Sequence, residues 1–343
     1  MKEISLIGLD LSKSVFQIHG VDSKGKEIMK KKFNRKELVE FLSNLKPCTV
    51  GLEACGGSNY WARKIKSMNH EVKMIAPQFV KPFVKSNKND ARDAAAIAEA
   101  VSRPSMKFVP IKTIHQQDVQ SIHRIRQSFV KSRSGLVNMT RGLLHEYGIV
   151  FPKGITQTRK MMIAIVTGEI ASTGDMTELT IHLINTLYEQ LKRLDEQISL
   201  LDKKTEIYSD QNEICKRIKT IPGVGPIIST AIYASAGDGS TFKSGRHMAA
   251  WLGIVPKHDG TGGKIKIKGI SKRGNPYLRM MLIHGARNVV MNSGKKNNKF
   301  NDWVTKLKER RGFNKACVAV ANKNARIIWA LLNKKEDYIA RVA

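Results

Sequence analysis

Apolar residues in the first hundred positions fall into short runs separated by turns. The run at 4–11 is nearly continuous, and residues 15–21 alternate as a half-buried strand does. A turn at 23–25 allows residues 27–33 to return as a third strand. Further strands are predicted at 49–54 and 72–75, and helices at 35–45 and 60–68. This order is that of ribonuclease-H folds, although other mixed sheets share it.

The middle of the chain has helical periodicity. Residues 90–102 (DARDAAAIAEAVS) are alanine-rich and end before Pro104, and a longer helix is predicted over 114–147. A heptad seam follows, made by Ile184, Leu187, Leu191, Leu194, Ile198 and Leu201. This seam fits either a hairpin with the preceding helix of the same chain or a coiled coil between protomers.

From residue 218 the chain is rich in Gly and basic residues, with helices expected at 300–311 and 315–332. The patterns predict three domains: an α/β domain at 1–110, a long-helix and coiled-coil region at 111–212, and a basic, mainly α domain at 213–343. The overall fold class is α/β plus α.

Charge changes this picture. The 343 residues carry a net charge of +30, and residues 214–343 alone hold 26 basic against 6 acidic side chains. Such a lopsided excess is typical of a domain that binds nucleic acid, and it predicts salt-sensitive binding. A membrane surface fits less well, because no basic amphipathic helix with bulky aromatics stands out.

The sequence also excludes several classes of protein. No apolar run reaches eighteen residues, and the first fifteen lack a signal-peptide core, so no membrane partner is expected and the protein should stay in the cytoplasm. The four cysteines are far apart without CxxC pairing, which argues against a disulfide framework or a zinc site. They are Cys48, Cys55, Cys215 and Cys317.

Four acidic residues carry the first candidate chemistry. Asp10 and Glu53 each interrupt an apolar strand, where a carboxylate is costly to bury unless it is paired or binds a cation. Asp90 and Asp93 are three apart on a predicted helix and so share a face. Converging carboxylates would hold Mg²⁺, and two such ions could cleave a phosphodiester. Helix capping by Asp90 and an ion pair of Asp93 are the simpler interpretation of that pair.

Two glycine-rich segments carry the second candidate chemistry. In IPGVGP, Gly223 and Gly225 precede a helix, a helix-hairpin-helix pattern that lets backbone N–H groups approach a DNA phosphate; an ordinary turn is the alternative. The second segment, 253–287, is a basic loop suited to phosphate, and it holds two candidate nucleophilic hydroxyls, those of Thr261 and Ser271. Its basic residues are Lys257, Lys264, Lys266, Lys268, Lys272 and Arg273.

Taken together and in order, these motifs resemble the DEDD transposases of bacterial insertion sequences, the IS110 family and most closely its IS1111 subgroup. The resemblance covers essentially the whole chain. It is carried by IGLDLSK, GLEACGGSNYW, KNDARDAAAIAEA, IPGVGPIISTAI, AAWLGIVPK, GGKIKIKGISKRGNPYLRMMLIHGAR and NKACVAVANKNARIIWALL.

The resemblance implies a RuvC-like N-terminal domain in which Asp10, Glu53, Asp90 and Asp93 hold magnesium, bound as two ions. It implies a coiled-coil linker and a C-terminal transposase domain whose serine links covalently to a DNA 5′-phosphate. It further implies a homo-oligomer, dimer or tetramer, with a composite active site. A non-coding bridge RNA would pair with donor and target DNA, so base pairing would choose the sites.

This chain departs from the family at the nucleophile. Aligned on Pro256 and the following GGK, it has Gly260-Thr261-Gly262 where the family has its serine. Either Thr261 is the nucleophile, the interpretation we favour, or the role moves to Ser271, or the protein is an inactive variant. Threonine can attack a phosphate, although its branched Cβ hinders it.

Two other functions fit the same residues. A RuvC-like endonuclease or junction resolvase would use the four acids without forming a covalent intermediate. An architectural nucleic-acid-binding protein would use the acids only structurally. The sequence does not reveal the target sites, the guide RNA, the oligomer size or whether insertion or inversion dominates.

Overall fold

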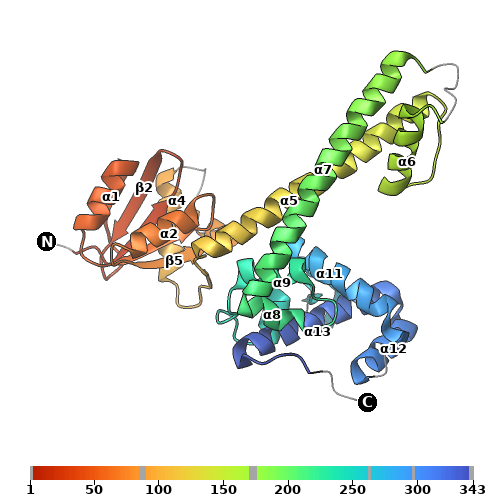
Figure 1. The fold of residues 1–343 in the computed structure, drawn as a ribbon. Coiled ribbons are helices and arrows are strands. Elements are labelled where there is room, and N and C mark those ends of the chain that lie inside the picture. Colours follow the sequence, from red (N-terminus) through yellow and green to blue (C-terminus); the bar gives the residue numbers. More distant parts are fainter. Residues whose placement is uncertain (1–2, 85–89, 170–175, 262–263, 296–297, 340–343) are drawn as a thin grey trace. The chain divides into compact units, whose positions relative to one another are not determined.

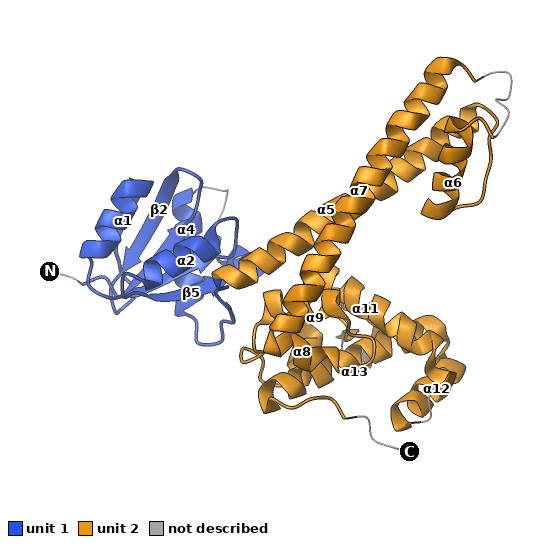
Figure 2. Ribbon diagram, viewed as in Figure 1, with its two compact units in different colours: residues 1–113 blue, residues 114–343 orange. Residues whose placement is uncertain are grey.

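The computed structural model describes residues 3–84, 90–169, 176–261, 264–295 and 298–339. The chain forms two compact units, residues 1–113 and 114–343 (Figure 2). The first unit ends close to the predicted boundary at 110. A separation of residues 111–212 from residues 213–343 stays a prediction.

The first unit is built on a six-stranded mixed sheet with the order β3-β2-β1-β4-β5-β6 (Figure 1). β1 pairs antiparallel with β2 and parallel with β4, β2 pairs antiparallel with β3, and β5 pairs parallel with β4 and antiparallel with β6. The strands are β1 (Leu6–Asp10), β2 (Val15–Val21), β3 (Glu27–Asn34), β4 (Thr49–Glu53), β5 (Glu71–Ile75) and β6 (Phe108–Val109). The three antiparallel strands followed by parallel ones confirm the predicted α/β order.

Helices cover this sheet and bury the predicted apolar positions. The helix at 35–44 begins at Asn34, whose side chain accepts from the backbone N–H of Lys36 and Glu37, while Glu37 reaches back to the Asn34 N–H. Leu38 and Leu42 on this helix are buried. The helical elements are α1 (Arg35–Asn44), α2 (Ser58–Lys66), α3 (Pro77–Val80), the short 3₁₀ helix η1 (Lys81–Phe83) and α4 (Asp90–Ser102).

The second unit is mostly helical, as predicted for the C-terminal half. Its helices are α5 (Ile114–Glu146), α6 (Ile155–Val166), α7 (Glu178–Gln211), α8 (Glu213–Lys219), α9 (Pro226–Ala236), α10 (Gly245–Trp251), α11 (Pro276–Met291), η2 (Ser293–Lys295), α12 (Lys299–Arg311) and α13 (Phe313–Lys334). A two-stranded sheet of β7 (Pro256–Thr261) and β8 (Lys264–Ile270) stands among them. No helix in the described part of the chain is long and apolar enough to cross a membrane.

The long helices α5 and α7 pack along each other within one chain, and α6 joins them (Figure 1). The buried cluster between them contains Leu136, Leu144 and Met162. Three residues of the heptad seam, Ile184, Leu191 and Leu194, are buried in it, and Leu187 packs against it. Two ion pairs connect the helices, Arg126 to Asp202 at 2.5 Å and Arg133 to Asp195 at 2.9 Å. The seam therefore serves the intramolecular hairpin, and a coiled coil between protomers stays a prediction.

A separate core holds the C-terminal part together. Its buried residues come from α8, α9, α10, α11, α12 and α13, and the glycine-rich turn after α8 contributes Ile221 and Val224. On α13, which covers the predicted helix at 315–332, Ala321, Ala325 and Ile328 are fully buried. The basic residues of this half consequently lie around a packed helical core.

Candidate functional site

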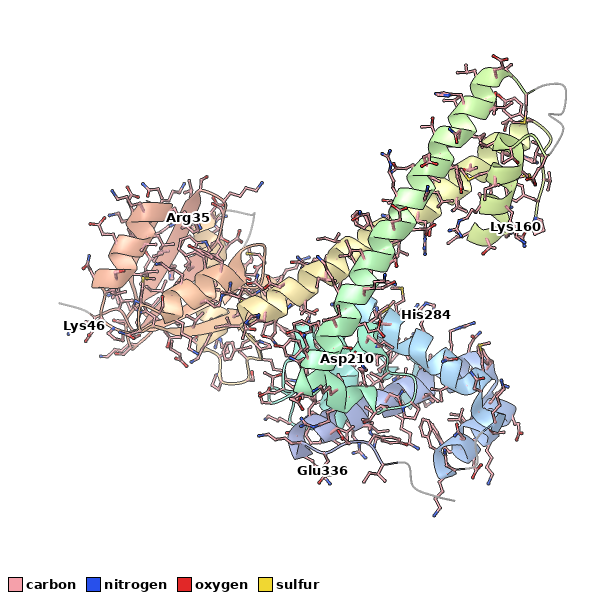
Figure 3. All side chains as sticks on the ribbon, viewed as in Figure 1. Arg35, Lys46, Lys160, Asp210, His284 and Glu336 are labelled. Carbon is pink, nitrogen blue, oxygen red and sulfur yellow. The ribbon has the colours of Figure 1, made fainter. Side chains whose placement is uncertain are left out.

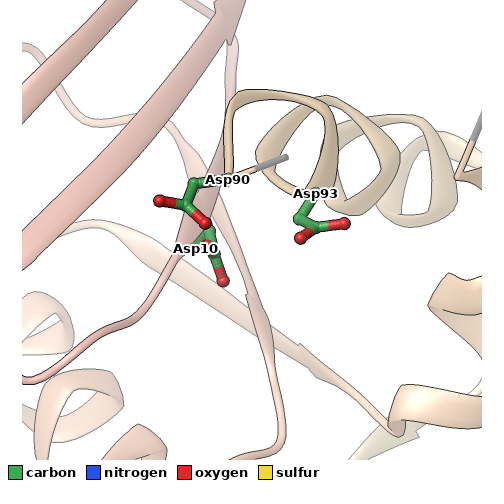
Figure 4. A group of neighbouring side chains, drawn as sticks. All are labelled: Asp10, Asp90 and Asp93. Atoms are coloured by element: carbon green, nitrogen blue, oxygen red, sulfur yellow. The ribbon is translucent and has the colours of Figure 1, made fainter. Parts of the chain in front are cut away.

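Three of the four predicted acids come together at one end of the first unit's sheet. Asp10 is the last residue of β1, and Asp90 and Asp93 lie in the first turn of α4. One carboxylate oxygen from each lies within 4.8 Å of the others (Figure 4). Asp10 and Asp93 are partly buried, whereas Asp90 is exposed.

The close packing of α4 on β1 explains why these residues meet. A Cβ added to Gly8 would lie 2.6 Å from the backbone nitrogen of Ala98 and 2.9 Å from its methyl group, so only glycine fits. The alanines of α4 present little side chain on the other side, and Ala94 and Ala98 are buried. Gly8 and the alanine-rich helix together bring the start of α4 to the end of β1.

Glu53 lies beside this group but is not part of it. It ends β4, and the parallel register pairs Leu9 with Leu52, so Asp10 and Glu53 follow at neighbouring strand ends. Both carboxylates act on Cys55: burial first, then Glu53 and Asp10, raise the pKa of its thiol. Glu53 therefore faces the same electronegative region as Asp10, and the predicted meeting of all four acids is seen for three.

The chemistry of this donor set suits a divalent cation. All the converging ligand atoms are carboxylate oxygens, which hard cations such as Mg²⁺ and Ca²⁺ prefer. Three negative charges within a few ångströms repel one another strongly unless a cation or protons offset them. The residues thus fit a metal centre at the end of β1.

The predicted PGVG turn joins α8 to α9, and its two glycines differ. Gly223 has φ +80°, and an added Cβ would lie 2.6 Å from the carbonyl oxygen of Gly285 on α11. Gly225 is exposed, precedes Pro226 at the start of α9, and has open space at the Cβ position. Gly223 is therefore required by packing, and Gly225 is the glycine whose backbone a phosphate could approach.

The basic segment after α10 is a β-hairpin and not an irregular loop. Its sequence from Lys264 to Ile270, KIKIKGI, alternates with the two-residue period of a strand. The register pairs His258 with Ile267, Asp259 with Lys266 and Thr261 with Lys264. Lys264, Lys266 and Lys268 are exposed. The dense Gly and Lys content concealed this period at the level of composition.

The two candidate nucleophiles have different surroundings. The Ser271 side-chain oxygen is buried and has no hydrogen-bond partner among the described residues, while its N–H donates to the Val255 carbonyl at 2.8 Å. Next to it, the Lys272 N–H donates to Gly253 at 3.0 Å. Thr261 is the last residue of β7, and only its backbone position is described. The exposed Lys272 and Arg273 lie in the turn after Ser271.

A buried polar network in the second unit has no signal in the sequence. His123 on α5 contacts the Tyr277 hydroxyl at 2.9 Å and the Thr230 hydroxyl at 3.0 Å. Burial, with a smaller contribution from Arg126, lowers the pKa of His123 to about 4. A cavity of about 340 Å³ opens beside it. The partners lie 107 and 154 residues away, so no local pattern could predict this contact.

Charged side chains cover both units (Figure 3). Many basic side chains of the second unit form ion pairs or contacts with aromatic rings within the protein. Lys219 pairs with Asp210, Arg159 pairs with Asp195, and Lys323 stacks 3.9 Å from the ring centre of Trp303. The hairpin lysines are exposed, and among them only Lys268 forms an ion pair that the structure describes, with Asp259 at 2.5 Å.

Comparison with known proteins matches both halves of the chain. Residues 7–149 match a family model described as "Transposase", of the DEDD type, and residues 215–301 match "Transposase IS116/IS110/IS902 family". The chain is 44% identical to "Probable family 20 transposase" of Pseudomonas aeruginosa over 98% of each sequence. It is also 44% identical to "Transposase for insertion sequence element IS1111A" of Coxiella burnetii, over 98% of this chain and 92% of the relative. A more distant relative is "Pilin gene-inverting protein" of Moraxella bovis, 23% identical over 85% of this chain and 82% of the relative.

Proposed function

Because this chain belongs to the IS116/IS110/IS902 family of insertion-sequence transposases, we propose that it cleaves and exchanges DNA strands in a divalent-cation-dependent reaction. Asp10, Asp90 and Asp93 hold the cation, with Glu53 completing the set from the neighbouring strand. The observation that carries this proposal is the convergence of three carboxylates within 4.8 Å at the end of β1.

Mg²⁺, bound as two ions, would neutralise the charge that develops on the phosphate and leaving oxygen. The chain's part is to position the ligands. Asp10 is held by β1, whose pairing on both sides leaves it little freedom, and Asp90 and Asp93 are held by α4. Such preorganised carboxylates need no rearrangement when the phosphate arrives.

Thr261 in the second unit is the proposed nucleophile. Its oxygen would form a bond to phosphorus as the P–O3′ bond breaks, leaving a free 3′-hydroxyl that takes up a proton. Attack by another 3′-hydroxyl reverses this step and releases threonine, so strands exchange without a net loss of bonds. The buried Ser271 oxygen supports this choice, because it is not open to a DNA phosphate.

The DNA contacts fall to the basic half. Gly225 at the start of α9 would receive a phosphate in the manner of a helix-hairpin-helix turn. Lys264, Lys266, Lys268, Lys272 and Arg273 would add charge contacts; Gly223 supports the turn by packing. Donor and target DNA are then held largely by their backbones.

We further propose a bridge RNA and a homo-oligomer, dimer or tetramer, in which the acids of one protomer meet Thr261 of another. The net excess of basic residues at 214–343 supports binding of more than one polyanion. RNA guidance requires a structured non-coding region beside the gene. Removing that RNA should stop site-specific exchange, whereas unchanged exchange after its complete removal would exclude guidance.

Trapping experiments test the reaction itself. Incubation with supercoiled element DNA and Mg²⁺, followed by denaturing electrophoresis, should give a protein–DNA adduct. Thr261→Ala and Asp10→Asn should each lower adduct yield at least about 10³-fold, whereas Thr261→Ser and Ser271→Ala should retain it. An adduct that survives Thr261→Ala but is lost in Ser271→Ala would assign the nucleophile to Ser271.

A second candidate function is a RuvC-like endonuclease or junction resolvase. The same acidic group favours it, because three carboxylates suffice for metal-dependent hydrolysis by water. It predicts Mg²⁺-dependent cleavage that gives no adduct and is unaffected by Thr261→Ala. Asp118→Asn, an exposed acid on α5, is the matched control for Asp10→Asn in both cases.

A further inference from the structure

The β7–β8 hairpin buries neither of its faces against the protein. All its described residues from Lys257 to Gly260 and from Lys266 to Gly269 are exposed, and Ile267 is 71% exposed. Two-stranded hairpins are marginal on their own in water. Here the base is anchored, because Pro256 pairs with Ile270 and the adjoining Ile254 is buried in the C-terminal core. The hairpin is thus a two-stranded ribbon that is fixed at its base and exposed on both faces.

Strand register sorts its side chains by chemistry. Alternate residues of a strand share a face, so Lys264, Lys266 and Lys268 lie on one face of β8 and Ile267 on the other. Cross-strand pairing adds positions 259 and 261 to the lysine face, because Asp259 pairs with Lys266 and Thr261 with Lys264. One face is therefore basic and contains the register position of the proposed nucleophile.

The shape of the ribbon suits the major groove of duplex DNA. Residues two apart on a strand are separated by about 6.7 Å, so Lys264 and Lys268 stand about 13 Å apart. The major groove of B-form DNA is about 12 Å wide and admits a two-stranded ribbon. With the ribbon lying along the groove, the long side chains of Lys264 and Lys268 can reach phosphates of the walls, and Lys266 lies between them above the base edges.

We propose that the β7–β8 hairpin lies in the major groove of B-form DNA with its lysine face inward. Lys264 and Lys268 bind phosphates of the groove walls, and Lys266 donates to guanine N7 or O6. The phosphate replaces Asp259 as the partner of Lys268, and the Asp259 carboxylate becomes solvated. Thr261 pairs with Lys264 in the backbone register, so the proposed nucleophile belongs to the same ribbon. This inference rests on the proposed function.

Groove shape decides between the two nucleic acids. The major groove of A-form RNA is deep and narrow, and protein elements do not enter it. The same lysines on a disordered loop would bind either polymer by charge alone. A fixed ribbon with lysines on one face should therefore prefer duplex DNA, and its contacts should depend on which face carries the charge.

Two full-length variants test this. Lys264→Gln/Lys266→Gln/Lys268→Gln should weaken duplex DNA binding and lower the slope of log affinity against log salt by about 2 to 3. Lys306→Gln/Lys308→Gln/Lys334→Gln removes the same charge from exposed positions on α12 and α13 and should leave the slope near the wild-type value. Thermal unfolding verifies that both variants fold.

A charge-neutral exchange is the sharper variant. Lys266→Ile combined with Ile267→Lys keeps composition and net charge but moves one lysine to the other face. We expect about a tenfold loss of affinity and loss of interference by guanine N7 methylation, a mark in the major groove. Unchanged affinity and interference would overturn the groove contact, as would a loss for stem-loop RNA with no loss for duplex DNA.

The outcomes separate this inference from the proposed function. If Asp10→Asn abolishes the adduct while the lysine variants bind DNA as the wild type does, only the role of the hairpin fails. If Asp10→Asn leaves the adduct intact, the proposed metal-dependent function fails whatever the hairpin variants show.

Discussion

The two units use charge in different ways. In the first, Asp10, Asp90 and Asp93 are gathered from a strand and a helix, and their meeting depends on the close packing at Gly8. In the second, lysines are spread along an exposed hairpin, where register alone sets their positions. The acidic centre therefore depends on close backbone packing, whereas the contacts of the hairpin depend on the number and spacing of its lysines. Mutations should affect the two units on different scales.

Between them, residues 114–213 carry twelve basic and twelve acidic side chains, so the long hairpin is electrically balanced. Its ion pairs, Arg126 with Asp202 and Arg133 with Asp195, join helices and leave little charge for DNA. The excess at 214–343 is accordingly not a property of the second unit as a whole. It belongs to the part that surrounds the C-terminal core.

Gly8→Ala should have the largest effect on the acidic side of this comparison. Its Cβ would strike the backbone of α4 near Ala98, pushing the helix and its two acids away from Asp10. A displacement of about 1 Å can cost 10²-fold in rate, so we expect at least about a 100-fold loss of strand cleavage. Gly135→Ala on α5, where a Cβ meets nothing within 4 Å, is the control and should cleave normally.

Cleavage rates measured on gels, with DNA affinity measured in parallel, separate an effect on catalysis from an effect on DNA binding. The account requires that Gly8→Ala keep its DNA affinity, because the lysines proposed to bind DNA belong to the second unit. A variant that cleaves as fast as the wild type would show that the acids do not need this packing.

His123 sharpens the comparison for the interior of the second unit. The folded protein keeps this side chain neutral, with its pKa lowered from 6.5 to about 4. Between these values the unfolded chain takes up a proton that the folded chain does not, so acid favours unfolding. The contribution of His123 to the free energy of unfolding is complete above pH 6.5 and falls by about 2 kcal/mol between pH 6.5 and pH 5.

Denaturant titrations of the wild type and His123→Gln across this pH range measure the difference. The variant should lose less stability on acidification, because glutamine does not titrate. Parallel curves for the two proteins would mean that folding does not lower the pKa of His123.

The smallest effect belongs to the charges of the turn after β8. Lys272→Gln with Arg273→Gln should weaken DNA binding about tenfold and lower the salt slope by about 2. Lys192→Gln with Arg193→Gln removes an equal, exposed pair from α7 and should change neither. Equal losses in the two variants, measured by fluorescence anisotropy at several salt concentrations, would contradict the assignment of DNA binding to residues 214–343.

The sequence predicted the elements of the first unit well, since strands and helices there differ clearly in period. The helix at 90–102 was predicted with its observed bounds, and the helix predicted at 35–45 is observed at 35–44. The short elements β6, α6 and α10 were missed, because their apolar residues form no long period. The helix α11 was also missed, although Leu278, Leu282 and Ala286 recur with helical spacing, because it lies at the end of the segment that was interpreted as a basic loop. The hairpin at 256–270 was interpreted as a loop from its composition.

Prediction of the site was limited by contacts that are distant in sequence. Asp90 and Asp93 share a helix face on spacing alone, but their approach to Asp10 requires the glycine at position 8 and the alanines of α4. Glu53 was placed correctly at the neighbouring strand end, yet its carboxylate is not in the three-residue group. Side-chain rotamers decide such distances, and no local pattern encodes them.

The central claim is that Asp10, Asp90 and Asp93 bind the divalent cation that strand cleavage needs. Mn²⁺ titration followed by electron paramagnetic resonance measures this binding without relying on activity. We predict that Asp10→Asn and Asp93→Asn each weaken Mn²⁺ binding at least about tenfold, whereas Asp118→Asn leaves it unchanged. Equal Mn²⁺ affinity in the wild type, Asp10→Asn and Asp93→Asn would contradict the account.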